Sequence, residues 1–124
     1  MTEARHSIEN KLSGLMTKNW QTYVKAWNAQ IKTERMRLLE KACAKDSCYV
    51  DPNIELEGHE ALCEYMQEFH QQMPEVRFEL TRFICHHRKS IACWQLINNK
   101  GIELFSGVSY GTCLLYTSPS PRDA

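Results

Sequence analysis

The spacing of the apolar residues changes near Pro74, and no other feature of the sequence constrains the fold as strongly. Before Pro74 the apolar residues recur at the spacing of one face of an α-helix, and after it they alternate with polar residues as in a half-buried strand. Helices that come first and strands that follow as a group are typical of α+β domains. The sequence therefore predicts an α+β fold in which helices cover one side of a curved antiparallel sheet.

The front half of the chain is predicted to begin with two helices. The first presents an apolar stripe with three aromatic residues, which runs from Met16 to Ile31. The second helix is short, and Thr33 is expected to be its N-cap because a threonine side chain can accept a hydrogen bond from the first turn. The residues that we expect the second helix to bury are Met36, Leu39 and Cys43.

A third helix is predicted between Gly58 and Pro74, after a short extended run at Cys48–Val50 that the sequence Asp51-Pro52-Asn53 ends. We expect this helix to lie across the concave face of the sheet. The residues on its apolar stripe are Leu62, Tyr65, Met66, Phe69 and Met73. Of these, Leu62, Met66 and Phe69 are expected to be buried.

The back half is predicted to form three consecutive antiparallel strands. They span 76–85, 90–98 and 102–110, and each is rich in β-branched and aromatic residues. The sequence Asn98-Asn99-Lys100-Gly101 is a turn signal between the last two strands. Short connections of this kind are typical of a meander, so each strand is expected to pair with the next one.

Charge and cysteine content exclude several classes of protein. Lys and Arg together number 15, and so do Asp and Glu together, so the net charge is zero. Without an excess of positive charge, binding to nucleic acid or to an anionic membrane is not favoured. No apolar run reaches the roughly 18 residues that a membrane span requires. Residues 1–112 contain five cysteines, an odd number, behind a polar start without a secretory leader pattern. These features predict a cytoplasmic protein with free thiols.

The last residues, 113–124, differ in character from the rest of the chain. Residues 113–123 correspond to one reading frame of a sequencing adapter, and the segment ends in two Ser-Pro pairs without an apolar face. We therefore expect residues 1–112 to form one domain and residues 113–124 to be a non-native tail. The final strand of the domain is expected to be missing.

Five short segments, in this order and spacing, resemble the SnoaL-like branch of the nuclear transport factor 2-like superfamily. They are Trp27-Asn28, Tyr49-Val50-Asp51-Pro52, Leu56–Ala61, Val76–Leu80 and His86-His87, the last just before a strand that carries Trp94. The resemblance implies a cone-shaped, strongly bent sheet around a pocket that the helices close, and commonly a homodimer packed through the outer face of the sheet. Members include polyketide cyclases, isomerases, epoxide hydrolases and dehydratases, and also proteins without demonstrated chemistry, so the fold alone does not choose a function.

Asp51 and His87 are the candidate catalytic residues. Apolar walls and Tyr49 would raise the pKa of the Asp51 carboxyl and suit it to acid-base chemistry, whereas an aspartate before proline more often ends a strand through an Asx-type turn. His87 would exchange protons near neutral pH, but it lies in the polar sequence His86–Lys89, which is typical of an exposed hairpin turn. For both residues the structural interpretation is favoured.

The aromatic residues are the candidate ligand-binding residues. Trp27, Tyr49 and Trp94 lie on segments that face the pocket in the resembling family, and Tyr65 is expected to join them. Trp20 and Phe69 are favoured as core residues instead. Relatives often carry an acid two residues after the glycine that corresponds to Gly107, where this chain has Ser109. A serine hydroxyl can orient a ligand but is not a base on its own.

Neither a metal nor another cofactor is indicated. Cys85 and His87 would share one face of a strand, with Cys93 across a hairpin, but no paired zinc-ligand motif is present.

Two functions remain open. The first is a domain that binds a small apolar or polyketide-like molecule, with lyase, isomerase or hydrolase chemistry through Asp51 together with His87 or a pocket tyrosine. The second is a non-catalytic module for dimerisation or ligand sensing, with its pocket filled by its own side chains.

Overall fold

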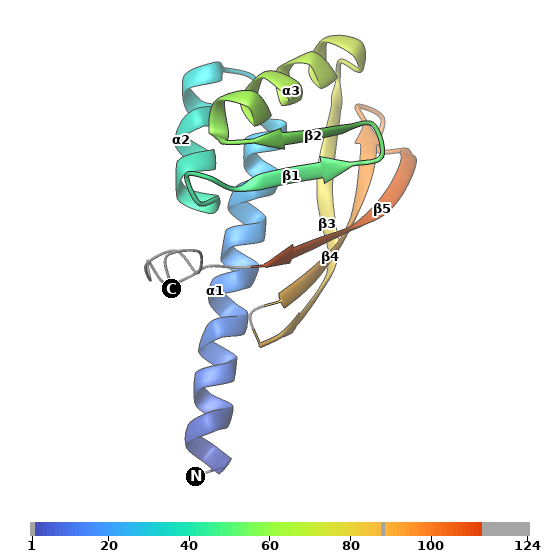
Figure 1. The fold of residues 1–124 in the computed structure, drawn as a ribbon. Helices are drawn as coiled ribbons and strands as arrows, with labels where there is room; N and C mark the ends of the chain where they lie inside the picture. The colour runs from blue at the N-terminus through green and yellow to red at the C-terminus, as the bar shows by residue number, and fades with distance from the viewer. Residues whose placement is uncertain (1, 88, 113–124) are drawn as a thin grey trace.

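The computed structural model describes residues 2–87 and 89–112. The predicted α+β fold is confirmed, with the helices in the front half and a three-stranded meander in the back half (Figure 1). The expected tail, residues 113–124, lies outside the described residues. The elements in chain order are α1 (Thr2–Asn28), α2 (Lys32–Ala42), β1 (Cys48–Asp51), β2 (Ile54–Glu57), α3 (His59–Gln72), β3 (Val76–His86), β4 (Lys89–Asn98) and β5 (Glu103–Thr112).

Helix α1 is longer than its apolar stripe predicted. It begins at Thr2, and its N-terminal part extends past the end of the sheet (Figure 1). Further along, Met16 and Ala26 are fully buried, and the helix packs against β3. The predicted stripe was wrong at its end, because the helix stops at Asn28 and Ile31 is exposed. Trp27 thus lies in the last turn of α1, directly before Asn28, at which the helix ends.

The side chain of Asn28 connects the end of α1 to β3. Its Nδ2 donates to the backbone oxygen of Phe78 at 3.0 Å, and its Oδ1 accepts from the backbone nitrogen of Phe78 at 2.8 Å. The amide thus satisfies both backbone groups of Phe78, as a neighbouring strand would. His70 of α3 contacts the backbone oxygen of Trp27 next to it. These contacts hold Trp27 and Phe78 beside each other.

Helix α2 begins earlier than the sequence predicted. The backbone nitrogen of Arg35 already donates to the oxygen of Ile31 at 3.0 Å, so Ile31 is the N-cap and Thr33 lies inside the first turn. The expected burial was also partly wrong. Leu39 is buried, whereas Met36 and Cys43 are only partly buried and pack at the edge of the core. The residues that α2 buries are Arg35, Leu38 and Leu39.

Strands β1 and β2 form an antiparallel hairpin, of which the sequence predicted only the first half. Asp51 pairs with Ile54, so the chain turns at Pro52-Asn53 and runs back beside β1. The alternation in Ile54–Glu57 is the signal that was missed. Pro52 and Asn53 end β1, as expected, and the return strand β2 begins directly after them at Ile54. The hairpin and α3 lie over one end of the molecule (Figure 1).

The position of α3 differs from the expected one. The helix follows Gly58, which has a φ of 92°, and it buries Leu62 and Met66 as predicted. Its main neighbours are α2 and β2, and it is α1 that packs along β3. Phe69 is only half-buried, although it was predicted to be buried. Its ring lies 5.3 Å from the ring of Phe78, at the side of a cavity.

The order of the large sheet is β3-β4-β5, and all neighbours are antiparallel as predicted. Trp94 lies opposite Leu80 on β3 and Gly107 on β5. Because side chains alternate along a strand, Ala92 and Leu96 share the face of Trp94, and both are fully buried. The opposite face of the sheet is exposed, and its apolar residues are Ile84, Ile91, Leu104, Val108 and Tyr110.

The five cysteines among the described residues are free thiols. Of these, only Cys63 is buried and Cys48 is exposed, and the other three are partly buried. Within the described part of the chain, no helix combines the length and the apolar character that crossing a bilayer requires.

Candidate functional site

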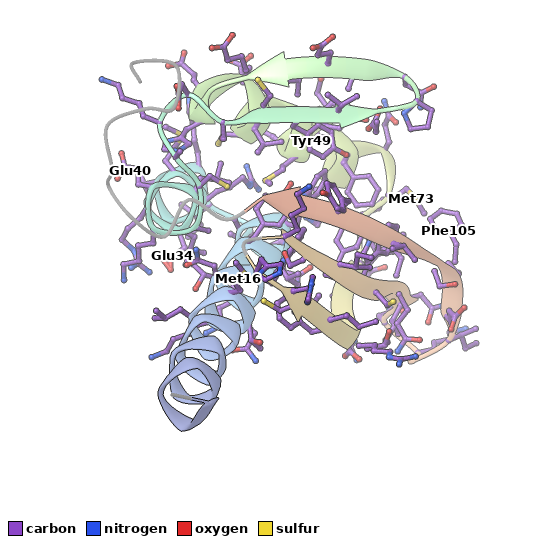
Figure 2. The ribbon with its side chains drawn as sticks, turned by 60° about the horizontal axis from the view of Figure 1, so that its bottom comes forward. Met16, Glu34, Glu40, Tyr49, Met73 and Phe105 are labelled. Atoms are coloured by element: carbon purple, nitrogen blue, oxygen red, sulfur yellow. The ribbon has the colours of Figure 1, made fainter. Side chains whose placement is uncertain are left out.

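A cavity of about 210 Å³ lies between the C-terminal part of α1, the hairpin, α3 and the inner face of the large sheet. Figure 2 shows Tyr49 on its wall, between the hairpin and β5. The residues that line the cavity are Tyr23, Val24, Trp27, Tyr49, Asp51, Tyr65, Phe69, Phe78, Trp94, Phe105 and Ser109. We call this cavity the aromatic pocket, because eight of these eleven side chains are Phe, Tyr or Trp.

Trp27 is the centre of the aromatic contacts around the pocket. Its ring centroid lies 5.2 Å from that of Phe78 and 5.7 Å from that of Phe69. The two tyrosines are slightly further away, with Tyr49 at 6.1 Å and Tyr65 at 6.2 Å. Distances of this size are typical of interacting aromatic pairs. Rings from α1, β1, α3 and β3 therefore support one another, and together they form the walls of the cavity.

The Asp51 carboxylate is the polar centre of the pocket, and it accepts four hydrogen bonds. Its Oδ1 accepts from the backbone nitrogens of Asn53 and Ile54, at 2.8 and 3.0 Å. Its Oδ2 accepts from the hydroxyls of Tyr49 and Tyr65, at 3.0 and 2.6 Å. The first pair is the Asx-type turn that the favoured interpretation predicted. The second pair turns the other oxygen toward the aromatic rings.

These contacts lower the pKa of Asp51. Desolvation alone raises that pKa, but the hydrogen bonds from Tyr65, Asn53, Tyr49 and Ile54 together outweigh it, because they stabilise the charged form. The expectation of a raised pKa was therefore wrong. The partners shift in the other direction: the bond to Asp51, followed by burial, raises the pKa of Tyr65 to about 12, and burial raises the pKa of Tyr49. Both tyrosines are hydrogen-bond donors at neutral pH.

The lowered pKa leads to a pH-dependent contribution of Asp51 to stability. Because the folded protein binds this proton more weakly than the unfolded chain, the contribution is complete above the unfolded pKa of about 3.9 and is lost as the pH falls through the folded value. The Asp51→Asn variant should therefore have a lower urea midpoint than the wild type at pH 7, with a smaller difference at pH 3. Urea titrations of both proteins at the two pH values test this. An equal difference at both would contradict it.

Trp94 and Ser109 form the second polar group of the pocket. The indole nitrogen of Trp94 donates to the Ser109 hydroxyl at 3.0 Å, across the β4–β5 ladder. Gly107 makes this position possible, because a Cβ at Gly107 would overlap three carbons of the Trp94 ring. The indole thus lies over the backbone of β5. The Ser109 hydroxyl accepts from Trp94 and keeps its own proton to donate.

The pocket brings together most of the predicted site residues. Asp51 and all five predicted ligand-binding residues line it; the latter are Trp27, Tyr49, Tyr65, Trp94 and Ser109. His87 is not among the lining residues. It lies in the turn between β3 and β4, exposed and with a φ of 57°, so the structure does not bring it to Asp51. The alternative interpretation of His87 as an exposed turn residue agrees with this position.

Five lining residues were not among the predicted site residues. They are Tyr23, Val24, Phe69, Phe78 and Phe105. Tyr23 precedes Trp27 by one helical turn, which was a usable signal. Phe69 was favoured as a core residue and lines the pocket instead. Trp20, the other residue favoured as core, is absent from the lining, and its indole nitrogen donates to Ser90 at 2.7 Å.

Other parts of the described structure offer weaker sites. A hollow of about 480 Å³ between α1 and α2 is larger, but it is open to solvent and its lining contains no aromatic residue. Its Glu34 and Arg37 already pair with each other at 2.6 Å. Among the described residues, no three His, Cys, Asp or Glu side chains converge as metal ligands would. Cys85 faces Ser90 across the hairpin, and Cys93 faces Arg82.

A family model and a solved structure both relate this chain to SnoaL-like proteins. The model of a family described as "SnoaL-like domain" matches residues 20–110. A candidate isomerase of the SnoaL-like family from Agrobacterium tumefaciens is similar in structure, with a TM-score of 0.72 and 28% identity, over 77% of this chain and 83% of its own. No curated protein matches.

Two further solved structures share the fold at low identity. An NTF2-like protein of unknown function from an Exiguobacterium species has a TM-score of 0.61 and 10% identity, over 77% of this chain and 86% of its own. A candidate ketosteroid isomerase from Kribbella flavida has a TM-score of 0.52 and 14% identity, over 90% of this chain and 87% of its own. At such identities the likeness supports the fold and no particular chemistry.

Proposed function

Since the chain belongs to the SnoaL-like family, whose fold carries many different chemistries, we propose that its function is to bind a small organic molecule in the aromatic pocket. The observation that carries this proposal is the composition of that pocket: aromatic walls around one carboxylate and one serine hydroxyl. Mostly apolar cavities with a few oriented polar groups are the usual form of small-molecule sites.

The open cavity favours binding over a purely structural module. In a module whose pocket is filled by its own side chains, the rings would close the space, whereas here a volume of about 210 Å³ remains between them. The polar groups are also held in place. Asp51 has four donors, and the Trp94 indole is held by Ser109. Groups held in this way lose little freedom when a ligand binds, which favours affinity.

Isomerase chemistry is a second candidate function, and the similarity to the candidate isomerase from Agrobacterium tumefaciens favours it. In this chain Asp51 would be the proton acceptor, because it is the only acidic residue that the described part of the chain contributes to the lining and Ser109 is not a base. Its lowered pKa makes it a weak proton acceptor at neutral pH. For this reason binding comes first in our proposal. Unchanged turnover of a substrate by Asp51→Asn would remove Asp51 from such a mechanism.

Tryptophan fluorescence tests the binding proposal. Trp27 and Trp94 line the pocket and Trp20 does not, so a small neutral quencher such as nitrobenzene should bind there and quench the emission saturably. The Trp94→Phe variant should lose a large part of the saturable quenching, because its remaining pocket indole is Trp27 alone. The matched control is Trp20→Phe, in which the saturable part should persist. Quenching that never saturates in the wild type would contradict binding in the pocket.

We also propose that the protein forms a homodimer through the outer face of the large sheet. Val108 and Tyr110 on β5 are 65% and 63% exposed, and Ile91 of β4 lies directly opposite Tyr110. Contiguous exposed apolar side chains of this kind are typical of interaction surfaces. Sedimentation of the wild type and of Val108→Lys tests the proposal: the variant should shift toward the monomer. A wild type that is monomeric at all concentrations would contradict it.

A further inference from the structure

We propose that the ligand of the aromatic pocket is a small organic cation, with a fully substituted ammonium head that faces Asp51 and the surrounding rings. This inference rests on the proposed binding function and adds the chemical class of the ligand. Three properties of the pocket support it: its charge, the state of its carboxylate and the nature of its walls.

The charge of the lining has one sign. Among the residues that the structure describes, Asp51 is the only ionised side chain that lines the pocket, and no Lys, Arg or His of that part of the chain does so. The hydrogen bonds from the two tyrosines keep this carboxylate charged at neutral pH. A charge next to low-polarity walls interacts more strongly than a charge in bulk water. The pocket therefore attracts cations and repels carboxylate or phosphate ligands.

The state of the carboxylate selects among cations. Two oxygens offer about four lone-pair positions, and two backbone nitrogens and two tyrosine hydroxyls occupy that number. A ligand with N–H groups would have to displace one of these donors, or leave its own donors unpaired, and an unpaired buried donor is costly. A fully substituted ammonium has no N–H group. Its attraction to the carboxylate is purely electrostatic and needs no free lone pair.

The walls suit the same kind of ligand. The eight aromatic lining residues present π systems from α1, β1, α3 and the three strands of the large sheet. Alkylammonium groups bind in aromatic surroundings because the ring quadrupole attracts the cation while the methyl groups contact apolar carbon. The Ser109 hydroxyl has a proton to donate, so a ligand with a hydroxyl beside its ammonium group has a second contact. A volume of about 210 Å³ limits the ligand to a small one, since drug-sized ligands occupy roughly 300 to 1,000 Å³.

Choline and dimethylbutanol form the decisive pair of probes. The alcohol used is 3,3-dimethylbutan-1-ol, which has the same shape as choline but carries a neutral carbon in place of the charged nitrogen. We expect the full chain to bind choline at least about tenfold more tightly than dimethylbutanol in calorimetric titrations, given the usual strength of cation–π contacts. In Asp51→Asn the ratio of the two affinities should fall severalfold. The wild-type comparison decides the question even if that variant is unstable.

Ethanolamine adds a test of the saturated carboxylate. It carries N–H groups in place of the methyl groups of choline, so the wild type should bind it more weakly. The Tyr65→Phe variant keeps the ring but frees one position on Asp51 Oδ2. In this variant the affinities for choline and ethanolamine should therefore differ less than in the wild type. An unchanged difference in Tyr65→Phe would overturn the argument from saturation. The matched control is Tyr110→Phe, whose exposed side chain is absent from the lining.

The possible results separate the two proposals. Equal affinity for choline and dimethylbutanol would overturn the inference of a cationic ligand and leave binding in the pocket intact. The absence of binding by choline would also overturn it, and the nitrobenzene titration then shows separately whether the pocket accepts a neutral molecule. Tight choline binding that is insensitive to Asp51→Asn would likewise contradict the assigned site.

Discussion

Replacing Trp27 by alanine should lower the free energy of unfolding by about 3 to 5 kcal/mol, the range for truncating a large aromatic residue in a core. The reason is the number of elements that meet at this side chain. Its ring contacts Phe78 of β3, Phe69 and Tyr65 of α3, and Tyr49 of β1. Without it these rings lose their common partner, and the space left behind adds to the pocket. Urea unfolding followed by circular dichroism measures the loss.

A control on the same helix separates packing from a general effect of substitution in α1. Leu15 is 50% exposed, so Leu15→Ala should change the stability by less than about 0.5 kcal/mol, as is usual for surface positions. Trp27→Phe keeps one ring and should recover part of the loss. A loss below about 1 kcal/mol in Trp27→Ala would mean that the rings around the pocket hold their positions without the indole.

The second large effect is expected from Gly107→Ala, which adds a single methyl group and should lower both the stability of the protein and its affinity for a ligand. The new Cβ would overlap the Trp94 ring, so the indole has to move away from β5 and its bond to Ser109 breaks. We expect a loss of about 1 to 3 kcal/mol, the usual cost of overpacking, and a loss of ligand binding through the displaced Trp94. The change in stability follows from urea unfolding, and the change in binding from the fluorescence titration.

Gly14 provides a matched control for Gly107. It lies inside α1 with nothing within 4 Å of an added Cβ, so Gly14→Ala should stabilise the protein by about 0.5 to 1 kcal/mol, because alanine loses less backbone freedom than glycine in a helix. The same substitution is thus expected to have opposite signs at the two positions. A Gly107→Ala variant as stable as the wild type would show that the sheet accommodates the methyl group.

The local pattern of the sequence accounts for most of the secondary structure, and two of its errors, at β2 and at the start of α2, fall at chain reversals. The three strands of the large sheet and the third helix were predicted because each has a long and regular apolar period. Strand β2 was missed because a four-residue strand has too short a pattern to stand out beside the turn at Pro52-Asn53. The start of α2 was misplaced because backbone bonding from Ile31, which the sequence does not show, determines it.

The sequence by itself determined the helix and strand periods, the α+β class, the resemblance to SnoaL-like domains and the set of aromatic residues available for a pocket. Tertiary structure decided which of these residues meet. The register of β4 and β5 places Trp94 opposite Gly107 and beside Ser109, and a shift of one residue would turn all three to the other face. The lowered pKa of Asp51 depends in part on the hydrogen bond from Tyr65, which is 14 residues away in the chain. His87 is excluded only by its place at the far turn of β3 and β4. Contacts between distant segments carry no local signal, because neighbouring residues do not encode the distance and orientation of a partner on another element.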